Sequence, residues 1–113
     1  MEHPPFKKLA ERFGTPLYVY EGARVRAEIS RLVAAFGRET LLCYSVKANG
    51  NLGLLRLIRG LGLGADVVSG GELAKVRRAG FAPEKVVFAG VGKTRVEMME
   101  ALNWGIRALT VES

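Results

Sequence analysis

Short apolar segments alternate with helical patterns from Leu41 onwards, and this alternation restricts the possible fold more than any other feature of the sequence. The apolar segments are residues 41–46, 65–68, 86–89 and 106–111, and the helical patterns between them are residues 52–61, 71–79 and 95–104. Strands that are apolar on both faces and alternate with helices are typical of parallel sheets, because helices cover such sheets. The sequence therefore predicts an α/β fold with four parallel strands and right-handed crossovers.

The residues before this alternation contain two further helical patterns. Residues 6–13 place their apolar side chains on one side, and Gly14 is expected to end that helix. Residues 17–20 are strong strand formers and predict a strand. Residues 21–36 have an apolar stripe at helical spacing, and Gly37 is a suitable C-cap. The chain is therefore expected to begin with a helix, a strand and a longer helix.

The last apolar segment is followed only by Glu112 and Ser113, so no helix is available to cover it. A doubly wound open sheet could end on such a strand. A (β/α)8 barrel requires eight strands and about 250 residues, whereas this sequence has 113 residues. The two alternatives are therefore an open sheet and a fragment that contains about half of a barrel.

The charge balance raises the question of nucleic-acid binding. The chain has 17 lysines and arginines, 11 acidic residues and a formal net charge of +6. Basic residues that bind nucleic acid are usually clustered, but here they are spread over all the helical patterns, mixed with glutamates, and never occur in a run longer than two. Solvated helix faces explain this pattern better, so a nucleic-acid-binding module is a distant alternative.

The sequence also restricts location. No apolar stretch approaches the roughly 18 residues needed to span a membrane. The N-terminus lacks the basic and apolar regions of a signal peptide. We therefore expect a cytoplasmic protein with no membrane partner.

Cysteine and histidine are too few for a disulfide or a metal site. Cys43 is the only cysteine, and its apolar surroundings predict a small buried side chain rather than a reactive thiol. His3 is the only histidine. No metal is expected, because the usual zinc sites need several such ligands.

Residues 89–94, Ala-Gly-Val-Gly-Lys-Thr, resemble a phosphate-binding P-loop, but their spacing is wrong. The P-loop pattern requires a glycine five positions before the Gly-Lys pair, and that position is Val87. A P-loop NTPase is therefore not expected. The segment still follows a predicted strand, at the sheet edge where parallel α/β proteins carry their functional residues.

Two acidic residues lie within or just after the second predicted strand. Asp66 is inside an apolar strand, where a carboxylate is costly unless it is paired or hydrogen-bonded. We therefore expect Asp66 to face a polar site at the carboxyl end of the sheet. Glu72 falls in the first turn of the next helix, where a carboxylate interacts favourably with the helix dipole. Helix capping and a functional role are equally compatible with Glu72.

Lys47 stands at the carboxyl end of the first predicted strand, after an apolar run. A lysine in a partly apolar pocket has a usable free amine, which suits Schiff-base chemistry with a carbonyl. A solvated lysine at the tip of a strand explains the position equally well. Position alone leaves both interpretations open.

Several motifs in the chain resemble those of one enzyme family. Residues 44–49, Tyr-Ser-Val-Lys-Ala-Asn, closely resemble the lysine motif of the fold-type III decarboxylases, which use pyridoxal 5'-phosphate (PLP). Residues 64–73 resemble the second signature of that family, residues 88–94 the third, residues 14–20 its first strand, and residues 111–113 the end of its fourth barrel strand. These alanine-racemase-like enzymes act on ornithine, arginine or diaminopimelate. The residues of the third signature favour diaminopimelate as the substrate.

The resemblance implies a fold, a cofactor and an activity. Residues 21–113 would be the N-terminal half of a PLP-binding (β/α)8 barrel with about four βα units, and residues 1–20 would form a helix and a strand that joins a second, mainly β domain. Lys47 would bind PLP covalently, and Asp66 would lie beside the cofactor. The implied activity is PLP-dependent decarboxylation of meso-2,6-diaminopimelate to L-lysine, in a homodimer.

Several parts of the family's site have no counterpart in this sequence. The glycine-rich phosphate loop, the acidic partner of the pyridine nitrogen, the substrate-binding arginine and a cysteine from the other subunit would all lie beyond residue 113, and Cys43 does not match that cysteine. We therefore predict that the chain alone has no decarboxylase activity. The alternatives are an ornithine, arginine or carboxynorspermidine decarboxylase, or a non-catalytic PLP-binding protein on the same barrel.

Overall fold

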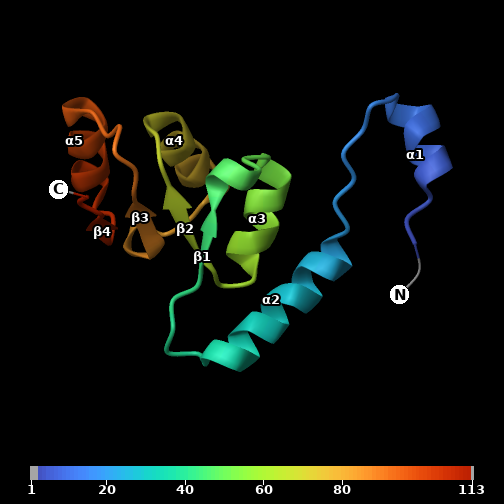
Figure 1. Cartoon of the computed structure of the whole chain (residues 1–113), viewed down its shortest axis with the longest axis horizontal. Coiled ribbons are helices and arrows are strands. Elements are labelled where there is room, and N and C mark those ends of the chain that lie inside the picture. Colours follow the sequence, from blue (N-terminus) through green and yellow to red (C-terminus); the bar gives the residue numbers. More distant parts are fainter. Residues whose placement is uncertain (1–2, 113) are drawn as a thin grey trace.

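A computed structural model describes residues 3–112, and its centre is a four-stranded parallel sheet in the order β1-β2-β3-β4 (Figure 1). The strands are β1 Cys43–Ser45, β2 Gly64–Val67, β3 Val86–Phe88 and β4 Ala108–Leu109. The connecting helices are α3 Leu52–Gly60, α4 Gly70–Ala79 and α5 Arg95–Trp104. All three strand pairs are parallel, which confirms the predicted alternation of strands and helices.

The three connecting helices cover one face of the sheet and leave the other face open. Ala65 and Val67 of β2 and Phe88 of β3 are fully buried, in one core with side chains from α3, α4 and α5. Asp66 alternates with the β2 core residues and is only partly buried. A doubly wound sheet has helices on both faces and a reversal in its strand order. The single covered face and the sequential strand order therefore favour part of a barrel over an open doubly wound sheet.

The outer strands are shorter than the sequence predicts. The predicted strand 41–46 is reduced to β1, after which Val46–Ala48 form a 3-10 turn, η1. The predicted strand 106–111 is reduced to the two residues of β4. Each of these strands has a single neighbour within residues 3–112, so ladder hydrogen bonds support only one of its sides. Ser113, the last residue of the motif at the end of the fourth strand, lies outside the described residues.

The two N-terminal helices have the predicted positions, but the predicted strand between them is absent. Helix α1 spans Phe6–Phe13, and helix α2 spans Gly22–Phe36 and is ended by Gly37. Residues 17–20 form no strand in the structure, and because the predicted strand would join a second domain, this assignment stays a prediction. A strand needs a neighbour to satisfy its N–H and C=O groups. No strand within residues 3–112 pairs with this segment, and Tyr18 is 90% exposed.

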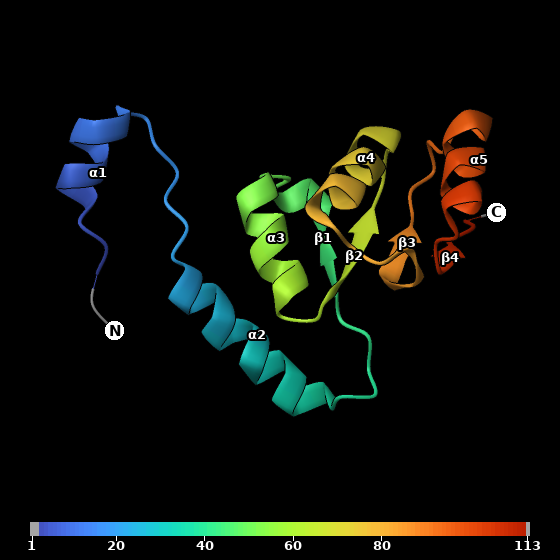
Figure 2. The ribbon, with the colours of Figure 1, turned by 180° about the vertical axis from the view of Figure 1, so that it is seen from behind.

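The N-terminal segment stands apart from the sheet, as both ribbon views show (Figures 1 and 2). Helix α1 contains no buried residue. The radius of gyration, 16.0 Å, exceeds the value of about 13 Å typical of a compact domain of this length. Helix α2 differs from α1, because its residues Val25 and Ile29 pack against the core.

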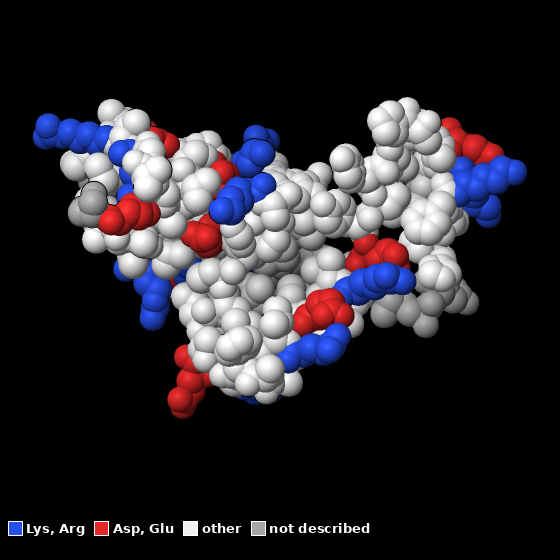
Figure 3. All heavy atoms as spheres, in the orientation of Figure 1, with Lys and Arg blue, Asp and Glu red and all other residues white. Residues whose placement is uncertain are grey.

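Charged side chains of both signs are interspersed over the face of the molecule shown in Figure 3. The positive side chains do not gather into one patch on that face, which agrees with the mixed charge pattern of the sequence. Within residues 3–112, no helix combines the length and the apolar character required to cross a membrane.

Candidate functional site

Lys47 lies on the turn η1, directly beyond the carboxyl end of β1. The preceding residue, Val46, is 1% exposed and anchors the turn in the core. Lys47 itself is exposed, so the described residues do not enclose its amine in the apolar pocket that its position suggested. The turn follows an edge strand with one neighbour, which leaves Lys47 open to solvent.

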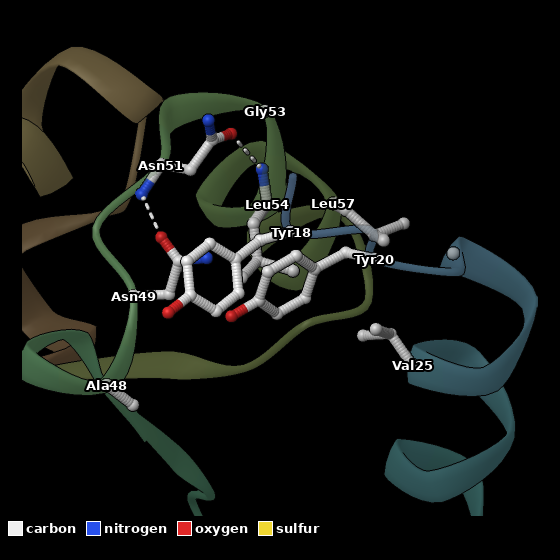
Figure 4. Close-up of a pocket in the computed structure, with 10 residues that line it drawn as sticks. Tyr18, Tyr20, Val25, Ala48, Asn49, Asn51, Gly53, Leu54 and Leu57 are labelled. Carbon is white, nitrogen blue, oxygen red and sulfur yellow. Dashed lines mark hydrogen bonds between the residues drawn. The ribbon is translucent and has the colours of Figure 1, made fainter. Parts of the chain in front are cut away.

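Hydrogen bonds hold the turn that carries Lys47. The Tyr44 hydroxyl donates to the main-chain oxygen of Asn49 at 2.9 Å. The N–H of Asn51 donates to Asn49 Oδ1 at 3.0 Å. Asn51 Oδ1 then accepts from the N–H of Leu54 at 3.2 Å and caps α3 (Figure 4). The residues Ala-Asn-Gly-Asn after Lys47 therefore close the turn and begin the next helix.

Asp66 lies on the strand beside β1, and its Cα pairs with those of Ser45 in β1 and Val87 in β3. Its Oδ1 atom is buried and has no hydrogen-bond partner among the described residues. Lys47 is two residues beyond Ser45, on the turn that follows β1, so the two predicted site residues belong to neighbouring βα units. A buried carboxylate oxygen without a partner is costly. This carboxylate is therefore suited to a polar group that residues 3–112 do not supply.

Cys43 lies on the same face of the sheet as Asp66, at the start of β1. Burial raises the pKa of the Cys43 thiol, the Asp66 carboxylate raises it further, and Arg107 acts in the opposite direction. A thiol with a raised pKa stays protonated at neutral pH and is a poor nucleophile. The structure thus agrees with a non-reactive Cys43, although its side chain is only partly buried because this face is open.

Glutamate carboxylates bind the main-chain N–H groups of the loops that follow β2 and β3. The pairs are Glu72 with Val68 at 3.3 Å, Glu97 with Gly70, and Glu112 with Gly90 at 3.0 Å. Glycine-rich loops bind phosphate through free main-chain N–H groups, but here carboxylates occupy these donors. These three N–H groups are therefore not free to bind a phosphate. Glu72 holds the turn before α4, which is a structural role of the kind that the sequence allowed.

Lys93, the lysine of the P-loop-like segment, is also engaged by neighbouring groups. Its ammonium donates to the main-chain oxygen of Gly90 and to Glu112 Oε2, the latter at 3.3 Å. Its side chain is only 7% exposed. The ion pair ties the loop after β3 to the residues that follow β4, so Lys93 acts as a structural link and not as a phosphate ligand.

A groove of about 770 Å³ lies between the turn after β1 and the N-terminal segment (Figure 4). Ala48 and Asn49 line it on the side of the turn, and Tyr18 and Tyr20 line it on the side of the N-terminal segment. Leu54 contributes an apolar surface from α3. Lys47 and Asp66 do not line this groove, although Ala48 and Asn49 directly follow Lys47.

Replacing Glu97 by glutamine is expected to make the chain less sensitive to acid. Hydrogen bonds from the main-chain N–H of Gly70, and then from the main chain and side chain of Thr94, hold the pKa of Glu97 below its ordinary value of 4.5. A carboxyl group with a lowered folded-state pKa contributes stability above its unfolded-state pKa, and this contribution is lost as the pH falls through the folded-state value. Urea midpoints at about pH 6 and about pH 3 measure the loss.

In that experiment the midpoint of the unmodified chain should fall more between the two pH values than the midpoint of Glu97→Gln. Glu100→Gln, one turn later in α5, is the control, because no described hydrogen bond joins Glu100 to a loop. An equal fall in the unmodified chain and in Glu97→Gln would contradict the role assigned to these hydrogen bonds.

Residues 22–113 match the family described as pyridoxal-dependent decarboxylase, pyridoxal binding domain. The match includes Lys47, Asp66 and all four strands. The chain therefore belongs to the pyridoxal-dependent decarboxylase family, as its motifs indicated.

Within that family, the chain is similar to diaminopimelate decarboxylases. It is 50% identical to the enzyme of Pseudomonas aeruginosa over 94% of this chain and 49% identical to that of Pseudomonas fluorescens over 93%. It is 46% identical to the enzyme of Aquifex aeolicus over 100% of this chain. The chain spans 26–27% of the length of these relatives.

Solved structures show the same relationship. AQ1208 from Aquifex aeolicus superposes with a TM-score of 0.91 at 47% identity, over 96% of this chain and 27% of that one. Diaminopimelate decarboxylase from Helicobacter pylori, complexed with L-lysine, superposes with a TM-score of 0.88 at 40% identity, over 96% of this chain and 28% of that one. Lysine/ornithine decarboxylase from Vibrio vulnificus gives 0.86 at 21% identity, which shows the fold alone. These matches confirm the predicted fold class, the N-terminal part of the barrel of this family.

Sequence reasoning did not identify the residues that hold the Lys47 turn and the glycine loops. Asn51 before an apolar helix has the type and position of an N-cap, and Thr94 with Glu97 has the spacing of a capping box. Both signals were visible in the sequence and could have been used. The hydroxyl contact of Tyr44 with Asn49 was not visible, because it depends on the conformation of the turn.

Proposed function

We propose that this chain is the N-terminal part of a PLP-dependent diaminopimelate decarboxylase, which converts meso-2,6-diaminopimelate to L-lysine and CO₂. The observation that carries the proposal is the position of Lys47 at the carboxyl end of β1, within the family's lysine motif. Identities of 46–50% to diaminopimelate decarboxylases support this substrate over ornithine or arginine. Bound L-lysine in three of the similar structures also supports it.

The residues present fit the cofactor at two points. Lys47 offers an exposed amine on a hydrogen-bonded turn, and Asp66 offers a buried carboxylate oxygen that lacks a partner among the described residues. Lys47 would hold PLP covalently through its amine, and Asp66 would orient that amine by charge attraction. When bound, PLP supplies an electron sink for the carbanion left when CO₂ departs.

The chain would not hold the phosphate of the cofactor by itself. The N–H groups of Gly70 and Gly90 are bound by carboxylates, and the family's phosphate loop would lie beyond residue 113. Activity would therefore require the remaining part of a protein as long as the relatives, of which this chain spans about a quarter. For that longer protein we also propose a homodimer in the cytoplasm, which light scattering and cell fractionation would test.

The experiment that tests this function compares substrates in the gene product that carries this sequence. With PLP, meso-2,6-diaminopimelate is expected to give L-lysine and CO₂, while ornithine and arginine remain unchanged. Products from ornithine or arginine alone would favour the alternative decarboxylases. PLP binding without turnover of any of the three would favour a non-catalytic PLP-binding protein.

The isolated chain of 113 residues is expected to form no lysine in the same assay, because it lacks the groups that would hold the phosphate and the substrate carboxylate. Lysine and CO₂ formed by the isolated chain would overturn this prediction. It would then follow that these 113 residues suffice for the reaction.

A further inference from the structure

A hydrogen bond spans the turn that carries Lys47. Its donor, the Tyr44 hydroxyl, comes three residues before Lys47, and its acceptor, the Asn49 carbonyl, comes two residues after it. The donor and acceptor are 2.9 Å apart. Between them, Val46 is buried in the core. The main chain at Lys47 is therefore held on both sides, although its side chain is exposed.

The tyrosine that makes this bond is itself held in place. The Cα of Tyr44 pairs with that of Ala65 in β2, on the face that the helices cover, and its ring packs against the buried core. Burial raises the pKa of Tyr44, and the neighbouring Tyr20 raises it further. The hydroxyl therefore keeps its proton at neutral pH and remains a hydrogen-bond donor.

Two asparagines extend the contact from the turn to the next helix. Asn49 Oδ1 accepts from the N–H of Asn51 at 3.0 Å, and Asn51 Oδ1 accepts from the N–H of Leu54 at 3.2 Å (Figure 4). The second bond caps α3. The Lys47 turn is thus joined to β1 through Tyr44 and to α3 through the asparagines. Two packed elements therefore fix the position of the turn.

We infer that Tyr44 is a positioning residue for Lys47: its hydroxyl fixes the turn so that the lysine amine is presented in one direction to the cofactor. This inference rests on the proposed function, which gives Lys47 the covalent bond to PLP. A covalent partner must be held close to its reactive geometry, because misplacement by about 1 Å can cost a hundredfold in rate. An exposed lysine on a loose turn would not meet that requirement.

The test uses Tyr44→Phe in the gene product that carries this sequence. Phenylalanine keeps the ring in its packed position but has no hydroxyl, so the hydrogen bond to the Asn49 carbonyl is lost. The matched control is Thr40→Val, which also removes a hydroxyl that donates to a main-chain carbonyl at 2.9 Å, that of Phe36. Thr40 lies before β1, at the opposite end of the strand from Lys47.

Two measurements separate positioning from mere stability. Amide hydrogen exchange of residues 47–50 reports whether the turn is held. Borohydride trapping of added PLP, followed by peptide mass spectrometry, reports the equilibrium attachment of PLP at Lys47. Tyr44→Phe is expected to accelerate the exchange and to weaken the attachment about two- to tenfold, the range of one net hydrogen bond. Thr40→Val is expected to change neither, even if it lowers the melting temperature by a similar amount.

Each other outcome contradicts a particular step. If amide exchange in Tyr44→Phe is unchanged, the Tyr44 hydroxyl does not hold the turn. Faster exchange with unchanged attachment, or an equal loss of attachment in Thr40→Val, would overturn the positioning of Lys47. If the unmodified protein shows no attachment at Lys47, the proposed function fails and the positioning role fails with it. The exchange result then still decides whether Tyr44 holds the turn.

Discussion

Replacing Lys47 by alanine is expected to abolish covalent binding of PLP and to lower the rate of decarboxylation by more than about a hundredfold in the gene product that carries this sequence. Alanine has no amine, so the cofactor loses its attachment point and the site loses a group that can transfer protons. The absorption band of protein-bound PLP and the release of lysine from diaminopimelate measure the two effects. No larger effect on activity is expected from any described residue.

Lys47 supplies both a positive charge and a reactive amine, and a second substitution separates the effects of these two properties. Lys47→Arg keeps a positive charge on the same turn, but a guanidinium stays protonated and cannot act as a free amine. We expect it to behave like Lys47→Ala. Lys8→Ala, an exposed lysine on α1, is the control and should leave both measurements unchanged. An absorption band that survives in Lys47→Ala would remove this residue from its proposed role.

The sequence predicted the sheet well because its signals are local. Apolar runs of strand length, separated by helical stripes, depend on residues close in the chain. The four strands of the sheet and the five α-helices lie where they were predicted, although β1 and β4 are shorter. The segment 17–20 shows the limit of such signals. Its residues favour a strand, but a strand also requires a neighbour, and residues 3–112 do not provide one. Local preference alone could not show that.

The candidate site was predictable only in part, for a similar reason. Asp66 could be singled out because a carboxylate within an apolar strand is costly, and the structure leaves its Oδ1 atom buried without a partner among the described residues. Lys47 could be placed near the end of β1, but not on the 3-10 turn that follows. The bond between Glu112 and Gly90 joins residues 22 positions apart, and no local pattern predicts it.

Gly64→Ala is the substitution expected to destabilise the chain most among its glycine positions. Gly64 begins β2 between the two neighbouring strands, and its N–H donates to the oxygen of Leu42 at 2.8 Å. A methyl group at this position would overlap the main-chain oxygen of Lys85, and it would lie 3.0 Å from Cys43 Sγ. Crowding of this kind typically costs 1–3 kcal/mol. We expect about 3 kcal/mol or more here, because a main-chain atom cannot turn away as a side chain can.

Urea unfolding of Gly64→Ala measures this cost, and Gly60→Ala is the matched control. Gly60 is the last residue of α3 and has no heavy atom within 4 Å of the added methyl group. Alanine is a better helix former than glycine, so this variant should be as stable as the unmodified chain or more stable by up to about 1 kcal/mol. A midpoint for Gly64→Ala equal to that of the unmodified chain would show that β2 and β3 are not packed as described.

The double variant Gly64→Ala with Cys43→Ala shows which contact causes the loss. If the thiol were the main obstacle, removing it would restore most of the stability, because the added methyl group would fill the space that Sγ vacates. If the Lys85 oxygen is the obstacle, the second substitution should restore little. The oxygen belongs to the residue directly before β3, and moving it away would pull β3 from its pairing with β2. We therefore expect the double variant to stay close to Gly64→Ala, since the spacing of two paired strands leaves no room for the added carbon.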